Sequence, residues 1–295
     1  MAGLGLQHLP APKRGYRPIK DTRRPDDKVD FESKGFSKRQ DQLRSHRLFQ
    51  SLEDLPVREH GQAVDLAQRL REGVEGNSPP RTIASSLYMR HLRNRIIGNL
   101  WPIVEDAYDD VVVATLMPTG MWVPASELSD TSPRLLMKRL INDLDRTGVT
   151  CAPGTLFAGL HAEFDVRRGG YDFHYHLVAT GEKAMALDNL RDMPKYKSER
   201  LELHEAGMKE RPRVKVTRGP FTNMPEPITY VVQSWLPHRP TKILADGTVE
   251  RSSFRWRIPE PYHARWLLWM DRHSISDFVI MQGMKVTKTG FYIFP

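Results

Sequence analysis

Apolar residues recur with two different spacings along the chain, and the change of spacing divides it into segments. Between Arg58 and Glu75 they return every three or four residues, which predicts a helix that ends at the following Gly-Asn-Ser-Pro-Pro run. A second helical pattern covers Ile83 to Ile97. From Asp109 onward the chain changes to short β-branched and apolar runs, which are typical of buried strands.

The second part of the chain alternates predicted strands with predicted helices. We expect strands at residues 110–118, 155–166, 172–179 and 213–217, helices at 132–148, 182–192 and 261–270, and a short apolar helix or strand at 228–236. The resulting order is β-α-β-β-α-β-α. This order predicts an α+β fold, with helices packed on one central antiparallel sheet and with helical extensions at both ends.

Four segments follow from these patterns. Residues 1–50 are rich in Lys, Arg, Asp, Pro and Gly without a period, which predicts a disordered basic arm. Residues 51–105 form a helical N-terminal extension, 106–245 the central domain, and 246–295 a helical C-terminal extension. The arm either contacts phosphate groups or is a solvated tail, and the sequence leaves both readings open.

Composition narrows the class of protein. The chain has 295 residues with 44 Lys+Arg against 36 Asp+Glu, a net charge of +8 and a single cysteine. One cysteine (Cys151) excludes an intramolecular disulfide and zinc sites built on paired cysteines, and it fits the reducing cytoplasm. The sequence shows no apolar run near the roughly 18 residues of a membrane helix and no apolar secretory leader. The excess of basic over acidic residues favours an anionic partner, either nucleic acid or an acidic membrane surface.

The most informative segment is a predicted β-hairpin over residues 159–181. If the turn is centred on Gly169-Gly170, each residue before it has a partner after it. In this register Asp165 faces His174, Glu163 faces His176, and His161 faces Val178. Successive strand residues point to opposite faces, so His174 and His176 share one face with the carboxylates.

Two neutral imidazoles and one carboxylate form a three-ligand site that leaves coordination positions open for a substrate oxygen. This donor set predicts a catalytic divalent cation held by His174, His176 and Glu163. The alternative is that both histidines lie on the solvated face of a half-buried sheet. Glu163 across the hairpin and the apolar neighbours Phe173 and Tyr175 favour the metal site.

These residues resemble the motifs of the HUH endonuclease superfamily, which includes rolling-circle replication initiators (Rep), plasmid relaxases and insertion-sequence transposases. Its histidine motif matches residues 173–178 (FHYHLV), and its strand motif matches residues 114–118 (ATLMP). Its third motif, a downstream nucleophilic tyrosine, matches residues 228–235 and Tyr230. The resemblance covers residues 109–236 and implies the RRM-like Rep form of the α+β fold.

The resemblance implies an endonuclease that nicks and rejoins single-stranded DNA. Mg²⁺ or Mn²⁺ on the two histidines and Glu163 would polarise the scissile phosphate. Tyr230 would attack phosphorus and leave a 5′-phosphotyrosine with a free 3′-hydroxyl. Such an enzyme would start replication or transfer of a plasmid, phage or other mobile element in a bacterial cytoplasm, with a host helicase as a partner.

The third motif differs from the family pattern. Thr229 or Gln233 stands where a lysine is usual, and Ser234 stands where some members have a second tyrosine, so the pattern is that of a single-tyrosine enzyme. Asp165 and Gln233 are candidate helpers of the reaction. Tyr196, between two lysines, is a rival nucleophile.

Basic residues between the hairpin and Tyr230 are the candidate DNA contacts: Arg167, Arg168, Lys195, Lys197, Lys209, Arg211, Arg213, Lys215 and Arg218. Tyr171, Phe221 and Trp235 are candidates for stacking on unpaired bases, with core packing favoured for Trp235. Two other functions stay open, namely a catalytically silent DNA-binding protein and a metal-dependent phosphodiesterase that uses water. A phosphate-binding P-loop is absent from the sequence, and a histidine-triad site is disfavoured because Val178 stands at the position of the third histidine.

Overall fold

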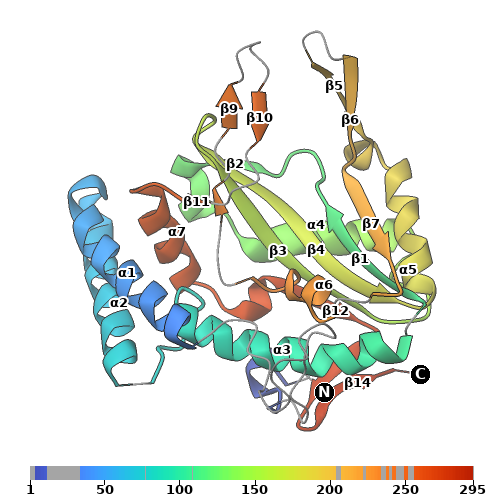
Figure 1. The fold of residues 1–295 in the computed structure, drawn as a ribbon, viewed down its shortest axis with the longest axis horizontal. Coiled ribbons are helices and arrows are strands. Elements are labelled where there is room, and N and C mark those ends of the chain that lie inside the picture. Colours follow the sequence, from blue (N-terminus) through green and yellow to red (C-terminus); the bar gives the residue numbers. More distant parts are fainter. Residues whose placement is uncertain are drawn as a thin grey trace, which may run out of the picture.

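The computed structural model is built around a mostly antiparallel sheet with helices on both faces (Figure 1). It describes residues 4–11, 34–76, 78–107, 109–203, 207–221, 224–233, 237–238, 241–243, 249–251 and 256–294. The α-helices are α1 (Lys34–Gln50), α2 (Val57–Glu75), α3 (Ser86–Ala107), α4 (Pro133–Arg146), α5 (Glu182–Ala186), α6 (Glu226–Thr229) and α7 (Tyr262–Asp271). Among these described helices, none is both long and apolar enough to cross a bilayer.

The strands of the central sheet run in the order β11-β8-β3-β4-β1-β7, with β12 also paired to β3 and β2 also paired to β4. Their bounds are β1 (Val111–Leu116), β2 (Trp122–Pro124), β3 (Leu156–Asp165), β4 (Gly170–Thr180), β7 (Val214–Arg218), β8 (Pro237–His238), β11 (Trp256–Arg257) and β12 (Val279–Gln282). The smaller hairpins are β5 (Glu199–Leu203) with β6 (Gly207–Arg211), β9 (Thr241–Ile243) with β10 (Val249–Arg251), and β13 (Met284–Thr287) with β14 (Gly290–Ile293). Only the β3–β8 contact is parallel among the pairs described.

The predicted α+β fold with a central antiparallel sheet is confirmed, and the local signals account for the elements. The β-branched run of β1 fills a central strand, where such side chains pack well on a pleated surface. Helix α4 begins where predicted because the Ser132 side chain accepts a hydrogen bond from the Leu135 amide, with Pro133 in the first turn. The predicted order from β1 to α7 is also present, with additional short strands inserted.

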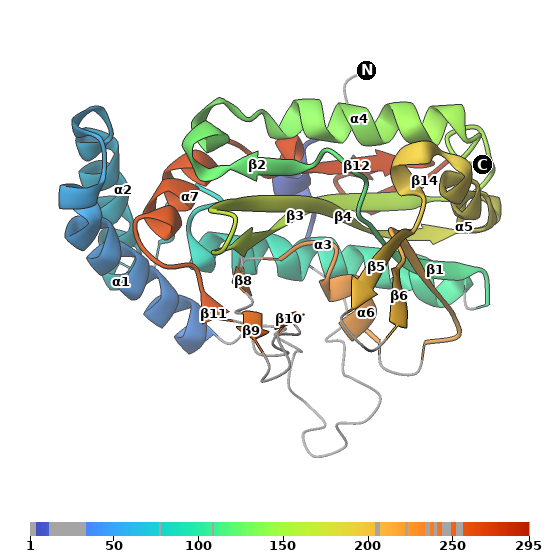
Figure 2. The same cartoon turned by 90° about the horizontal axis from the view of Figure 1, so that it is seen from above.

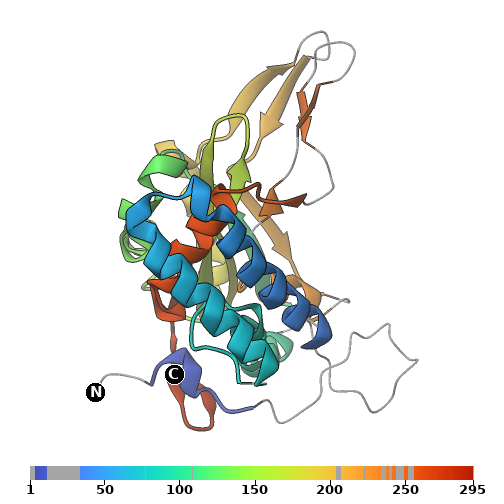
Figure 3. The same cartoon turned by 90° about the vertical axis from the view of Figure 1, so that its left-hand side faces the viewer.

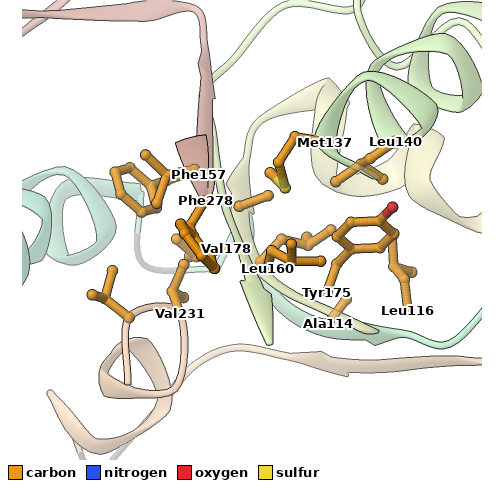
Figure 4. Packing of buried hydrophobic residues seen from close by; sticks show 14 of the residues in the cluster. Ala114, Leu116, Met137, Leu140, Phe157, Leu160, Tyr175, Val178, Val231 and Phe278 are labelled. Atoms are coloured by element: carbon orange, nitrogen blue, oxygen red, sulfur yellow. The ribbon is translucent and has the colours of Figure 1, made fainter. Parts of the chain in front are cut away.

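One face of the sheet packs on α4 and α7. Tyr175 of β4 is fully buried and donates a hydrogen bond to the Leu136 carbonyl of α4 at 2.7 Å. Phe173 contacts Trp269 of α7, with ring centroids 5.8 Å apart. Figure 4 shows Tyr175 beside Met137 and Leu140 in this part of the core. These odd-numbered β4 residues therefore anchor the sheet, and the even-numbered residues face the other way.

The opposite face carries the histidines and is approached by α3 and α6. Figure 2 shows the sheet with α4 on one side and with α3 and α6 on the other. His174, His176 and Asp172 of β4 are all half-buried, in contrast to the buried residues between them. This alternation places a polar patch on an otherwise apolar sheet.

The N-terminal segment is more ordered than the sequence predicted. The expectation of a disordered arm over residues 1–50 is wrong for Lys34–Gln50, which forms α1 and packs against α2 (Figure 3). It is also wrong for Leu6 and Leu9, which are buried in the main core. A helix with polar residues on most sides gives no clear period, so tertiary contacts decide its formation. Residues 12–33 lie outside the described part.

The C-terminal segment is helical only in part. Helix α7 confirms the predicted helix at 261–270, but β12, β13 and β14 follow it. β12 pairs with β3, so Val279 lies opposite Gly159 in the central sheet. The expectation of a wholly helical extension is therefore wrong, because a strand that follows α7, β12, pairs with the edge of β3.

The register of the β3–β4 hairpin also differs from the predicted one. Asp165 lies opposite Gly170, so the turn is Val166–Gly169 and not Gly169-Gly170. Asp165 Oδ1 accepts hydrogen bonds from the amides of Arg167 and Arg168, at 3.0 and 3.2 Å, and thereby fixes the longer turn. The consequences are that His161, and not Asp165, faces His174, that Glu163 faces Asp172, and that His176 faces Gly159. The shift moves each partner by an even number of residues, so the predicted shared face is retained.

Helix α3 is held at its start by a buried carboxylate from α1. Asp41, which is fully buried, accepts hydrogen bonds from the amides of Ser86 and Leu87 and from the Ser85 hydroxyl, at 2.6, 3.1 and 2.7 Å. It thus caps the first turn of α3 from a distant part of the chain. Burial raises the pKa of Asp41, although the Arg44 guanidinium and these hydrogen bonds oppose that rise.

We expect Asp41→Ala to lower the free energy of unfolding by about 2 kcal/mol, because the first amides of α3 lose their acceptor inside the protein. Asp41→Asn keeps one acceptor oxygen and is expected to cost less. Urea unfolding of the three proteins measures the difference. Equal stability of Asp41→Ala and the parent protein would contradict the capping role.

Candidate functional site

Three histidines meet on the sheet face opposite α4. His161 lies directly across from His174, and His176 is the next residue on the same face of β4. The ring centroids are 4.9 Å apart for His174 and His176 and 4.6 Å apart for His161 and His176. The predicted register paired His161 with Val178, but the observed register places it opposite His174 and brings it into the cluster.

The hydrogen bonds of the His174 and His176 rings orient their Nε2 atoms toward each other. His174 Nδ1 lies 3.3 Å from the Asp172 carbonyl, and because a carbonyl only accepts, Nδ1 carries the proton. The lone pair of a neutral His174 is then on Nε2, which lies 3.2 Å from His176 Nε2. His176 Nδ1 is bonded to the Thr115 hydroxyl at 2.9 Å. Contacts of this kind to the far ring nitrogen are what holds a metal-binding histidine in place.

The histidine cluster meets only some of the requirements of a site for a divalent cation. Two histidine nitrogens bound to one ion lie about 2.1 Å from it, and for an angle of about 90–110° at the ion they are roughly 3.0–3.4 Å apart. The distance between the Nε2 atoms of His174 and His176 is 3.2 Å, within this range. A third ligand is not in place: among the residues that the structure describes, no group of three His, Cys, Asp or Glu could hold a metal ion. The described geometry therefore supplies a two-imidazole pair and not the predicted three-ligand set.

Glu163 does not face His176 as predicted. It lies opposite Asp172 on the histidine face, one cross-strand row beyond His161 and His174. Both carboxylates are half-buried. In the register of the hairpin, this row holds the carboxylates nearest to His161 and His174. The sequence analysis did not identify Asp172 as a candidate site residue.

His161 fastens the turn that follows α6 to the sheet. Its Nε2 lies 3.0 Å from the Val231 carbonyl and therefore donates the hydrogen bond. Burial, with a smaller contribution from His174, lowers the pKa of His161 to about 3, so the ring stays neutral near neutral pH. Val231 itself is buried in the core, beside Val178 and Phe157 in Figure 4.

Gly159 permits this contact. A Cβ atom built at position 159 would lie 1.9 Å from the Val231 carbonyl oxygen, so any larger residue would push the turn off the sheet. The requirement is one of close approach and not of unusual backbone angles. Gly159 is therefore a determinant of the site that carries no functional group.

Tyr230 is brought beside the histidines by the same turn. It follows α6 directly, and its ring centroid lies 6.2 Å from that of His176. Arg93 of α3 donates from Nε to the Val232 carbonyl at 2.7 Å and holds the other side of the turn. Tyr230 thus lies close to His176, although it lies in a turn and not inside a helix.

The remaining helper candidates lie elsewhere. Asp165 is bound to the hairpin turn, four residues along β3 from His161 or about 13 Å, so it does not reach the histidine pair. Gln233 is half-buried and lines a pocket behind His161. The other residues of this pocket include Leu160, Val232, Trp266 and Phe278, so its wall is mainly apolar.

Tyr196 is not available as a rival nucleophile. Its side chain is 1% exposed, and its hydroxyl donates to Asp143 at 2.9 Å. Burial, reinforced by the charge of Asp143, raises the pKa of Tyr196 far above its usual value. A buried phenol held in this way is a structural group.

The predicted DNA contacts divide into two groups. Lys195, Arg213 and Arg218 are engaged by the protein: Lys195 pairs with Asp143 at 2.5 Å, Arg213 donates to the Met117 carbonyl, and Arg218 pairs with Asp188. Arg167, Arg168, Lys197 and Lys215 have exposed side chains. The side chains of Lys209 and Arg211 lie outside the described part. Lys215 is the member closest to the histidines in register, because it lies opposite Thr115.

The aromatic candidates are mostly core residues. Tyr171 is fully buried and donates to the Tyr262 carbonyl, so the stacking role predicted for it is wrong. Phe221 packs against the main core, and Trp235 lies outside the described residues. Sequence reasoning missed Trp122 and Arg93, because their proximity to the site depends on pairings far apart in the chain, and it named Thr115 only as part of the strand motif.

Comparison of the chain with protein-family models, with curated proteins and with solved structures finds no match.

Gly159→Ala is expected to lower the free energy of unfolding by about 1–3 kcal/mol, because the new methyl group collides with the Val231 carbonyl. Gly61→Ala is the matched control, since nothing lies within 4 Å of a Cβ there and α2 gains a better helix former. We expect the control to be neutral or stabilised by up to about 1 kcal/mol. Urea unfolding distinguishes them, and a neutral Gly159→Ala would contradict the close approach.

The low pKa of His161 predicts a pH dependence of stability. Its pKa is about 3 in the folded state, whereas an unfolded histidine titrates near pH 6.5. Below about pH 6.5 the unfolded chain binds the proton and the folded protein does not, so His161 destabilises the fold progressively as the pH falls toward 3. His161→Gln should reduce the loss of stability between about pH 6.5 and 4, as measured by urea unfolding at each pH. Parallel curves for the two proteins would exclude this assignment.

Proposed function

We propose that this protein is a HUH-like nickase and strand transferase that acts on single-stranded DNA, with Tyr230 as its nucleophile. The observation that carries the proposal is the position of the Tyr230 ring, 6.2 Å from His176, whose Nε2 faces that of His174. A phenol beside a pair of imidazole rings whose Nε2 atoms converge suits covalent phosphoryl transfer. Its biological role would be to start replication or transfer of a plasmid, phage or other mobile element.

His174 and His176 would hold the divalent cation, Mg²⁺ or Mn²⁺, through their Nε2 atoms. The carboxylate row of Glu163 and Asp172 is the nearest source of a further ligand on the same face. When bound, the cation would act as a Lewis acid toward a phosphate oxygen. Thr115 and the Asp172 carbonyl would keep the two rings oriented while the substrate enters.

Tyr230 would form a bond from its phenolic oxygen to the scissile phosphorus. The bond between phosphorus and the 3′-oxygen of the preceding nucleotide breaks, and that oxygen leaves with the electron pair and takes a proton. The product is a 5′-phosphotyrosine and a free 3′-hydroxyl. The reaction can be reversed by the same hydroxyl, so the site can also rejoin or transfer a strand.

His161, Gly159 and Arg93 would position Tyr230 without touching the substrate. His161 and Arg93 bind the carbonyls of the two residues that follow Tyr230, and Gly159 lets the turn approach the sheet. The phenol is thereby held in one place before DNA binds. Such preorganisation lowers the entropic cost of reaching the reactive geometry.

The exposed cations of this region would contact the phosphate backbone. Lys215 lies on the strand row of Thr115 and His176, and Arg167 lies at the tip of the β3–β4 hairpin. Contacts of this kind are independent of base sequence and weaken as salt is raised. The net charge of +8 favours the approach of such a polyanion.

The decisive test is a covalent adduct. The protein is incubated with labelled single-stranded DNA and Mn²⁺, and we expect an SDS-resistant protein–DNA band that Tyr230→Phe abolishes. His174→Ala and His176→Ala should reduce the band by on the order of a hundred-fold or more, because they remove the cation's ligands. The control is Tyr292→Phe, which alters an exposed tyrosine on β14 and should leave the band unchanged.

The other possible results identify the alternatives. Cleavage without an adduct would assign the site to a metal-dependent phosphodiesterase that uses water. Binding of single-stranded DNA with neither cleavage nor adduct would make the protein a DNA-binding member of the same fold. Either result would overturn the nickase proposal.

A further inference from the structure

A tryptophan lies on the histidine face at the hairpin end of the sheet. Trp122 of β2 is directly opposite Asp172 of β4, so the two side chains are on the same face. His174 is the next residue of that face along β4, about 7 Å away along the strand. The indole is therefore a neighbour of the histidine cluster that the proposed reaction does not use.

The Trp122 ring is held between the hairpin and an exposed cation. A Cβ atom at Gly170 would lie 2.9 Å from the indole, so glycine allows the ring to lie against β4. The Arg168 guanidinium carbon lies 4.6 Å from the ring centroid. Trp122 Nε1 is buried and has no hydrogen-bond partner among the described residues. The ring is thus held by packing and by one exposed arginine.

We propose that Trp122 and Arg168 form a subsite for one unpaired nucleobase of the DNA strand. The inference rests on the proposed function, because it assigns a second contact to the same substrate. The base would stack on the indole face that Arg168 covers, and the displaced guanidinium would contact the adjoining phosphate. Stacking of this kind is open to every base, since each has a π face.

The local charges favour a base over a phosphate at this position. Glu163 and Asp172 lie in the same cross-strand row as Trp122, and their carboxylates would repel a phosphate placed on the indole. A neutral base meets no such repulsion. Arg168 is on an exposed turn and can follow the backbone to the outside of this row.

The cation over the Trp122 ring comes from an exposed turn, and this suits a contact that a base has to displace. Because the guanidinium is exposed, its attraction to the indole is weak, so its displacement by a base costs little. Base–aromatic stacking contributes a comparable or larger amount. The exchange is therefore favourable once a strand is bound near the histidines.

The test measures binding of single-stranded DNA without divalent cation, so that cleavage plays no part. A labelled strand of about 16 nucleotides is titrated by fluorescence anisotropy, and copies with one abasic position are titrated in turn. Trp122→Leu should weaken binding of the intact strand on the order of ten-fold. One abasic position should weaken binding to the parent protein by a similar factor and should have no further effect on Trp122→Leu.

Tyr292→Leu is the matched control, because Tyr292 is an exposed aromatic ring with Lys285 over it at 5.1 Å. It should change binding by less than about two-fold and show no coupling to any position. Arg168→Ala supplies a second measurement that leaves the indole in place. It should lower the slope of log affinity against log salt by about one phosphate contact and keep the abasic coupling.

The outcomes separate the subsite from the proposed function. Salt-dependent binding that is the same for Trp122→Leu and the parent would overturn the subsite and leave the DNA proposal standing. Weaker binding by Trp122→Leu without coupling to any base would show that Trp122 only holds the hairpin, and would also overturn it. Failure of the parent protein to bind the strand would overturn both proposals.

Discussion

The contact between the Val231 carbonyl and the sheet determines the geometry of the candidate site. His161 donates to this carbonyl at 3.0 Å, and Gly159 leaves the space that the oxygen occupies. Without both, the turn that carries Tyr230 loses its hydrogen bond to β3 and its close approach to the sheet, and α6 is only a single turn of helix. A partly buried hydrogen bond and a missing side chain therefore help to decide where the phenol lies.

The same turn connects the sheet to the N-terminal helices. Arg93 of α3 holds the Val232 carbonyl, and α3 is capped at its start by Asp41 of α1. One buried and one partly buried polar contact, joined by α3, thus link α1 to the residue after Val231. The N-terminal helices consequently contribute to the position of Tyr230, and they are more than an addition to the core.

The basic residues that were predicted to contact DNA fall into two groups, those paired within the protein and those exposed to solvent. Lys195 and Arg218 neutralise carboxylates and hold short connections, whereas Lys215 and Arg168 are exposed close to the polar face. Exposed ion pairs contribute little to stability, but exposed cations beside a reactive face contribute to the capture of an anionic substrate. The net charge alone does not distinguish the two groups.

The sequence by itself determined the main elements between β1 and α7 and the polar side of the β3–β4 hairpin. The β-branched runs, the Ser132 cap and the alternation around His174 and His176 are properties of neighbouring residues, so they could be interpreted without the fold. The tertiary structure alone decided the hairpin register, the entry of His161 into the cluster and the helix at Lys34–Gln50. It also decided the contacts of Gly159, Arg93 and Trp122, because the partner of each residue is distant in the chain. The hairpin register depended on the length of the β3–β4 turn, which the sequence left ambiguous. Periodicity specifies a face, but only packing specifies the partner across from it.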